Sequence, residues 1–192
     1  WMVQGTTFRR TSAESLVTTL LDGSPGLLPL GLEVQGGDLL GRYNWGLWGG
    51  EASVQTYFDY LSAAMGEYGR GGISTFDVDF QHRLVPEGRH ELMWGSGARY
   101  VKTDISTVTD TLSMSPPQRS IQIFSAFLQD EITLVPHLLK LTLGARVEHS
   151  TLSHFEPQPS ARLMWTPTRV DSVWANWSRA ARTPSVGEIG AT

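Results

Sequence analysis

Hydrophobic and polar residues alternate with a period of two along most of this chain, a pattern that predicts β-strands whose two faces meet different surroundings. The clearest example is residues 51–60. One face there carries Ala52, Val54, Thr56, Phe58 and Tyr60, and the other carries Glu51, Ser53, Gln55, Tyr57 and Asp59. The alternation returns in residues 75–83, 139–148, 160–166 and 173–178. None of these segments has a helical stripe of matching quality, so the pattern predicts an all-β protein.

Two longer segments follow the alternation less well. In residues 89–101, Met93 interrupts the polar face. In residues 121–134, Asp130 interrupts the apolar face that carries Phe124, Ala126, Leu128 and Ile132. We interpret this second segment as one long strand that contains a bulge. With residues 2–9 and 39–45 the count reaches about nine strands, many of them as long as the roughly 9–11 residues that cross a bilayer.

The connections between these segments are short and long in strict alternation. Tight turns are predicted near residues 48–50, 86–88, 135–137 and 167–169, and longer loops at residues 10–37, 61–72, 104–118 and 150–157. Outer-membrane barrels are built in this way, as antiparallel up-and-down meanders with short turns at one end and long loops at the other. A soluble sheet with one solvated face would show the same alternation of hydrophobic and polar residues. The Greek-key connections of a β-sandwich, however, would place short and long connections at both ends of the sheet.

The polar face of the predicted strands carries both signs of charge. Its charged residues are Asp77, Asp79, Arg83, Glu91, Arg99, Lys140, Arg146, Glu148 and Arg162. A charge that faced the middle of a bilayer would cost several kcal/mol, of the order of 2–4 for a cation. The mixture therefore fits the interior of a barrel that is wet or filled by a polar plug. The alternative is the solvated outer face of a soluble sheet.

Aromatic residues lie near the predicted strand ends. Trp45 and Trp48 flank one tight turn, Trp165 and Trp174 flank another, and Tyr60 and Tyr100 lie beside long loops. A girdle at the two membrane interfaces would place them there. The alternative is ordinary cross-strand packing.

Composition excludes several classes of protein. The 192 residues are 40% hydrophobic and 18% charged, with a formal net charge of −4, which excludes a disordered chain and argues against a nucleic-acid partner. No apolar stretch reaches the roughly 18 residues of a spanning helix. The absence of cysteine excludes disulfide frameworks and thiolate sites. The chain shows no signal peptide and starts and stops inside patterned sequence, so we expect it to be a fragment.

Candidate chemistry is sparse, and we expect no catalytic residue, cofactor or metal. His149 and His154 flank one loop, but isolated loop histidines are usually solvated. Gly95, Ser96 and Gly97 lack the five-residue pattern of a nucleophile elbow, and in a strand such glycines let a barrel wall bend. Three further features are read as structural: the glycines at 69, 71 and 72, the sequon at 176–178, and the neighbouring carboxylates of Asp77 and Asp79.

Four segments in the second half resemble the barrel of TonB-dependent outer-membrane receptors. Phe127 to Glu131 resembles an aromatic-x-Gln-Asp-Glu segment, and Leu141 to Glu148 is similar to the family's Leu-x-x-Gly-x-Arg strand. Phe155 to Leu163 matches a loop that descends into the next strand. Val173 to Ser185 resembles the strand that ends in Ser-x-x-x-Arg-x-Pro-Ser. Together these motifs span about residues 120–188.

The resemblance implies that residues 1–192 are part of a 22-stranded transmembrane β-barrel, with the plug domain, the TonB box and the end of the barrel absent. It implies an active transporter, not an enzyme, that takes up a scarce nutrient such as a ferric siderophore or cobalamin. The implied partners are outer-membrane lipid, TonB and that nutrient ligand, and the full-length protein would be a monomeric barrel. The alternatives are a porin, a barrel hydrolase or a secreted sugar-binding β-sandwich. The ligand-binding residues are unknown; Tyr68, Arg70 and His154 have suitable chemistry but no further support.

Overall fold

The computed structural model describes residues 1–19, 23–66, 69–86, 88–107 and 117–181. Nine strands follow one another along these residues: β1 (Met2–Thr19), β2 (Pro25–Leu47), β3 (Gly50–Met65), β4 (Gly69–Leu84), β5 (His90–Thr107), β6 (Gln118–Val135), β7 (Leu139–Ser150), β8 (Glu156–Trp165) and β9 (Val173–Ser178). Within the described residues no helix is long and apolar enough to span a membrane. The predicted all-β fold is confirmed.

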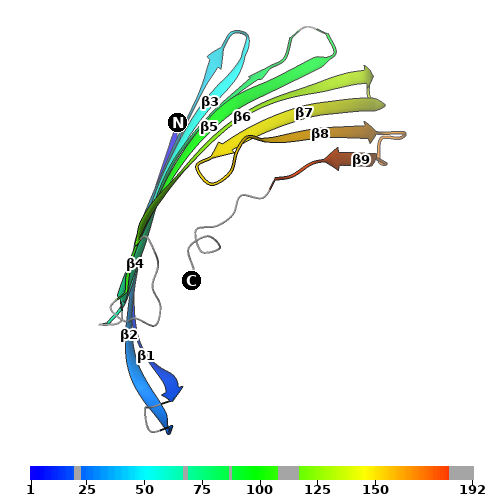
Figure 1. Cartoon of the computed structure of the whole chain (residues 1–192). Coiled ribbons are helices and arrows are strands. Elements are labelled where there is room, and N and C mark those ends of the chain that lie inside the picture. Colours follow the sequence, from blue (N-terminus) through cyan, green and yellow to red (C-terminus); the bar gives the residue numbers. More distant parts are fainter. Residues whose placement is uncertain (20–22, 67–68, 87, 108–116, 182–192) are drawn as a thin grey trace.

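The nine strands form one sheet in the order of the sequence. Each strand pairs antiparallel with the next, from β1 through β9, and the sheet is strongly curved (Figure 1). β1 and β9 are its two edges, so the sheet is an open arc of an up-and-down barrel wall. The predicted architecture, a partial antiparallel barrel of about nine strands, is therefore confirmed.

The described residues have almost no dry interior. Among their hydrophobic side chains only Ala52 and Ile121 are buried, whereas Phe76, Phe124 and Leu128 are about half exposed or more. A β-sandwich needs a second sheet to cover such a face, and the described residues contain one sheet only. The β-sandwich alternative is therefore wrong for this part of the chain.

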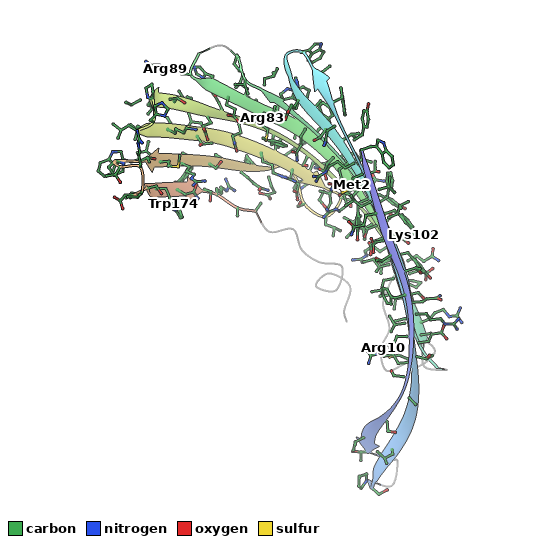
Figure 2. All side chains as sticks on the ribbon, turned by 180° about the vertical axis from the view of Figure 1, so that it is seen from behind. Met2, Arg10, Arg83, Arg89, Lys102 and Trp174 are labelled. Atoms are coloured by element: carbon green, nitrogen blue, oxygen red, sulfur yellow. The ribbon has the colours of Figure 1, made fainter. Side chains whose placement is uncertain are left out.

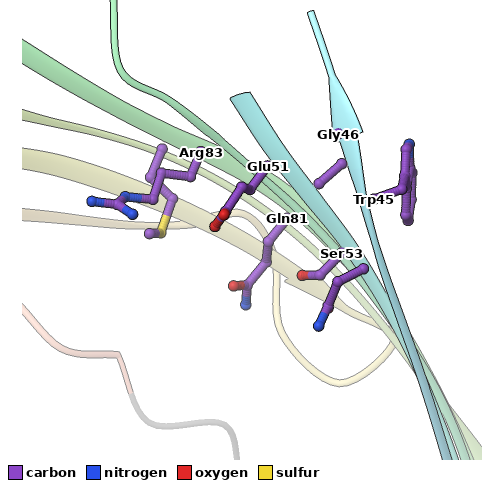
Figure 3. Close-up of a pocket in the computed structure, with 9 residues that line it drawn as sticks. Trp45, Gly46, Glu51, Ser53, Gln81 and Arg83 are labelled. Carbon is purple, nitrogen blue, oxygen red and sulfur yellow. The ribbon is translucent and has the colours of Figure 1, made fainter. Parts of the chain in front are cut away.

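The two faces of the sheet are chemically distinct. The cross-strand register places all nine charged residues of the predicted polar face on one side, with Arg83 opposite Glu51 and Asp77 opposite Arg99. Figure 3 shows Glu51, Gln81 and Arg83 on the concave side of the curved wall, with Trp45 on the convex side. Figure 2 shows side chains standing on both faces along the whole arc. The concave face is thus the polar face, and the convex face carries the apolar band.

Two of the predicted long loops are mostly strand. β1 continues to Thr19 and β2 begins at Pro25 within the range 10–37, and β3 and β4 occupy most of the range 61–72. In the range 104–118, β5 continues to Thr107, and residues 108–116 lie outside the described residues. The 23 residues of β2 span about 75 Å, far more than a bilayer requires. The prediction was wrong because the alternation of hydrophobic and polar residues fades where both faces of a hairpin are in water. The loop at 150–157 is confirmed, since residues 151–155 separate β7 from β8.

Two of the short turns have the backbone φ angles and hydrogen bonds that their turn types require. Trp48 and Gly49 have φ values of 48° and 76° and form the two-residue link from β2 to β3, as a type I′ hairpin requires. In the β6–β7 turn, Leu138 N donates to Val135 O at 3.1 Å, and His137 has a φ of 60° after Pro136. The register shifts between Thr133 and Val135, which confirms the bulge predicted in residues 121–134.

Candidate functional site

The middle of the concave face is a network of paired charges. Arg99 Nε donates to Asp77 Oδ2 at 2.7 Å, and the Asp77 residue is buried. Asp79 lies beside them, with Arg99 and Arg146 as its cationic neighbours. These side chains and Glu148 line a hollow of about 400 Å³. Arg99 therefore holds the Asp77 carboxylate, and Asp79 lies beside Asp77 within the field of both arginines.

Gly97 makes room for this network. A Cβ atom at Gly97 would lie 2.5 Å from Asp79 Oδ1 and 3.2 Å from Ser125 Oγ. Ser125 Oγ in turn accepts a hydrogen bond from Arg146 Nη2 at 3.1 Å. Gly97 was predicted to let the barrel wall bend. The structure gives a second reason for a glycine at this position, because side chains from both neighbouring strands approach it closely.

A second polar cluster lies on the concave face nearer the short turns. Arg83 Nε donates to Glu91 Oε1 at 2.6 Å, and Lys140 Nζ donates to Glu131. Beside Arg83 is a hollow of about 560 Å³ (Figure 3), whose polar lining comes from β2, β3 and β4. The polar side chains are Asn44, Glu51, Ser53, Gln81 and Arg83. Both clusters present paired charges, and the second adds the amides of Asn44 and Gln81. Such groups suit contact with water or with a polar protein surface.

The candidate chemistry of the sequence lies at separate places in the described structure. No group of three or more His, Asp or Glu residues in the described part of the chain is placed to hold a metal ion. The His149 ring stacks on Phe155 at 4.7 Å, and His154 is exposed in the following loop. Asn176 and Ser178 of the sequon lie within β9.

The convex face carries an aromatic belt near the short turns. The Trp45 ring lies 6.1 Å from Phe80, and Phe80 lies 5.3 Å from Trp94. His82 is fully buried between Trp48 and Trp94, at 5.8 Å and 5.7 Å, with its Nε2 2.9 Å from Leu47 O. Aromatic rings beside an apolar band are typical of a membrane interface. The belt includes Trp94 and Phe80, which the sequence analysis did not assign to it.

The register tests the other predicted girdle residues. Trp165 pairs with Val173 and Leu139 on the convex face, and Tyr60 and Tyr100 also lie on that face. The prediction for Trp174 was wrong. It shares the concave face with Arg162, whose guanidinium carbon lies 5.5 Å from the Trp174 ring centroid. The prediction placed Trp174 correctly beside the turn, but it assigned the side chain to the wrong face of the sheet.

Two of the three residues named as possible ligand contacts lie in the described part of the chain. Tyr68 lies outside the described residues. Arg70 is on the convex face at the start of β4, and His154 is in the loop between β7 and β8. The described part of the chain brings no two of them together.

An ion pair on the apolar convex face was missed. His90 Nδ1 lies 2.7 Å from Asp130 Oδ2, and Asp130 Oδ1 is buried with no hydrogen-bond partner among the described residues. The signal was present in the sequence, because Asp130 breaks an otherwise apolar face. The histidine partner was not recognised because it lies 40 residues away along the chain.

We expect His90→Leu to destabilise the folded barrel by about 1–3 kcal/mol, because it leaves the Asp130 carboxylate without its partner beside apolar side chains. The double variant His90→Leu/Asp130→Leu is expected to recover most of that loss. Urea unfolding of the full-length protein refolded into vesicles measures both. His154→Leu, in the exposed loop, is the matched control and is expected to have no effect. Additive losses in the double variant would contradict the coupling of the pair.

Comparisons with known proteins agree with this geometry. Residues 6–192 match the family model described as TonB dependent receptor-like, beta-barrel. The crystal structure of the siderophore receptor PirA from Pseudomonas aeruginosa is similar, with a TM-score of 0.67 at 17% sequence identity. The match covers 82% of this chain and 31% of that one, so the chain spans about a third of that receptor. At this identity the likeness shows the fold alone. No curated protein matches the sequence.

Proposed function

Because this chain belongs to the TonB-dependent receptor-like β-barrel family, we propose that it forms part of the wall of an outer-membrane transporter that takes up a scarce nutrient such as a ferric siderophore or cobalamin. The observation that carries the proposal is one curved sheet with an apolar convex face and a charged concave face. Such a wall is stable only where lipid covers its outside and water or polar protein its inside.

The turns give the orientation of this wall. The tight turns, such as Trp48–Gly49, face the periplasm, and the strands extended beyond the bilayer at the other end face the exterior. A nutrient ligand would meet those extended hairpins first and then pass along the concave face. The chemistry is binding and gated passage, with no covalent step.

The partners of this transporter lie largely outside these residues. The free edges of β1 and β9 pair with the remaining strands of a closed, monomeric barrel. A plug domain would rest on the paired charges of the concave face, and TonB would act through that plug. The similarity to PirA, a siderophore receptor, supports a ferric siderophore as the first ligand to test.

Nutrient uptake under limitation tests the proposal. A strain that lacks the full-length gene is expected to lose uptake of one radiolabelled ferric siderophore, or of cobalamin, and to regain it when the wild-type gene is restored. The regained uptake is expected to vanish in a strain without TonB and after a protonophore is added. Gene-dependent uptake of small hydrophilic solutes that survives both treatments would indicate a porin and contradict the proposal.

A further inference from the structure

On the side away from the short turns, the strands of this wall end at very different heights. β7 ends at Ser150, and the row of paired residues that runs through Ser150 crosses β5 at Arg99 and β2 at Leu40. Beyond that row, β5 continues to Thr107, about 25 Å farther, and β2 reaches back to Pro25, about 50 Å farther. The rim of the wall therefore has a step. It is high over β1 to β5 and low at the loop between β7 and β8.

The low part of the rim, residues 151–155, is called the rim loop here, and hydrogen bonds hold it down. Ser150 N donates to Ser153 O, and Ser153 N donates to Ser150 O, each at 3.3 Å. The Ser150 residue is buried. Thr151 N donates to Gln122 O at 3.0 Å, which ties the rim loop to β6. A loop whose backbone is paired in this way keeps the rim low at this point.

The highest part of the rim bends over the lumen, the space on the concave side of the wall. β3 pairs with β2 only as far as Leu32, opposite Met65, so residues 13–19 and 25–31 form a two-stranded ribbon beyond the rest of the sheet. Figures 1 and 2 are opposite views, and both show this ribbon curving toward the concave side. The ribbon therefore leans over the lumen from the high side of the step.

A cation without a partner lies on the concave face at the step. Arg119 is opposite Thr103, in the part of β6 that continues beyond the end of β7. Its Nη1 atom is buried and has no hydrogen-bond partner among the described residues. By contrast, Arg99 on the same face is paired with Asp77. Buried donors are nearly always paired in folded proteins, so Arg119 calls for an acceptor, and an anionic group that crossed the rim loop would reach it.

We propose that the nutrient enters the lumen over the rim loop, below the ribbon. The high strands and the ribbon obstruct approach from their own side, whereas the rim loop is low and is fixed to β6. Arg119 lies on the concave face beside this route. The inference rests on the proposed function, because it concerns the path of the transported nutrient.

Cysteine variants of the full-length receptor test this route, since residues 1–192 contain no cysteine of their own. His154→Cys places a thiol on the rim loop, where the side chain is exposed. Ala13→Cys is the matched control, at an exposed position of the ribbon on the convex face. Cells with each variant, and wild-type cells, are treated either with N-ethylmaleimide or with a polyethylene-glycol maleimide of several kilodaltons. Gel shifts report the folding of each barrel and the extent of its labelling.

The readout is the initial rate of uptake, at low concentration, of the radiolabelled ferric siderophore or cobalamin that the wild-type receptor takes up. We expect the polymer on His154→Cys to lower this rate at least about fivefold, because it slows the encounter of the nutrient with the lumen. The polymer on Ala13→Cys, and N-ethylmaleimide on either variant, are expected to leave the rate unchanged. A rate that is indifferent to the polymer on the rim loop, or that falls equally with the polymer on the ribbon, would overturn the route. So would a loss that N-ethylmaleimide alone produces at residue 154, because it would show a local contact and not an obstructed path.

The wild-type receptor separates this inference from the proposed function. A wild-type receptor without TonB-dependent uptake would refute the transport proposal, and the route with it. A wild-type receptor that takes up the nutrient, beside a polymer-labelled His154→Cys variant that does so at the same rate, would refute the route alone.

Discussion

Replacing Phe124 with arginine is expected to lower the free energy of unfolding of the barrel by about 2–4 kcal/mol, the cost of placing a cation near the middle of a bilayer. Phe124 lies on the convex face of β6 opposite Ala98, between the levels of Trp94 and Tyr100, and 53% of its surface is exposed in the described structure. In a soluble protein, an arginine at so open a position would be almost neutral. The size of the loss therefore measures whether lipid covers this face.

The concave face of the same strand supplies the control. Gln129 lies on the concave face, opposite Met93 and Gly144, and Gln129→Arg is expected to change the unfolding free energy by less than about 0.5 kcal/mol. Both variants are measured by urea titration of the full-length protein refolded into vesicles. Equal losses for the two substitutions, or none for Phe124→Arg, would contradict the assignment of the two faces and with it the membrane barrel.

The faces of the strands could be predicted from the sequence because side chains alternate strictly wherever the two sides meet unlike surroundings. All nine charged residues assigned to the polar face lie on the concave side. The same rule fails where both faces of a strand meet the same surroundings. β1 continues to Thr19 and β2 begins at Pro25, in a stretch where hydrophobic and polar residues do not alternate.

Contacts between distant strands were beyond the sequence analysis, because they depend on the register between strands. Asp130 was recognised as a break in the apolar face, but its partner His90 becomes visible only when β5 is paired with β6. Gly72 is a similar case. It was noted as one of a cluster of glycines along the chain, yet Ser62 and Asp104 lie beside it only through two strand pairings.

Replacing Gly95 with valine is expected to prevent assembly of most of the barrel. A Cβ atom at Gly95 would lie 2.3 Å from the backbone oxygen of Phe80 and 2.7 Å from Cε1 of the Phe127 ring. Relief of the first contact requires β4 and β5 to separate, which breaks hydrogen bonds of the ladder between them. We expect a loss of about 3 kcal/mol or more, at the upper end of over-packing. The fraction of folded full-length protein in outer-membrane preparations, read from the heat-dependent gel shift, measures it.

Two further variants identify which of these contacts matters. Gly71→Val changes a glycine on the concave face of β4 whose Cβ would meet nothing closer than Ile105 Cγ1, at 3.6 Å, and it is expected to assemble normally. Phe127→Ala removes the ring above Gly95, so it would rescue Gly95→Val if the ring were the main obstacle. Because the nearer contact is with the backbone oxygen of Phe80, we expect Phe127→Ala to give little rescue. Full rescue would show that Gly95 serves only to accommodate the aromatic ring, and that the close approach of β4 and β5 can relax without cost to the wall.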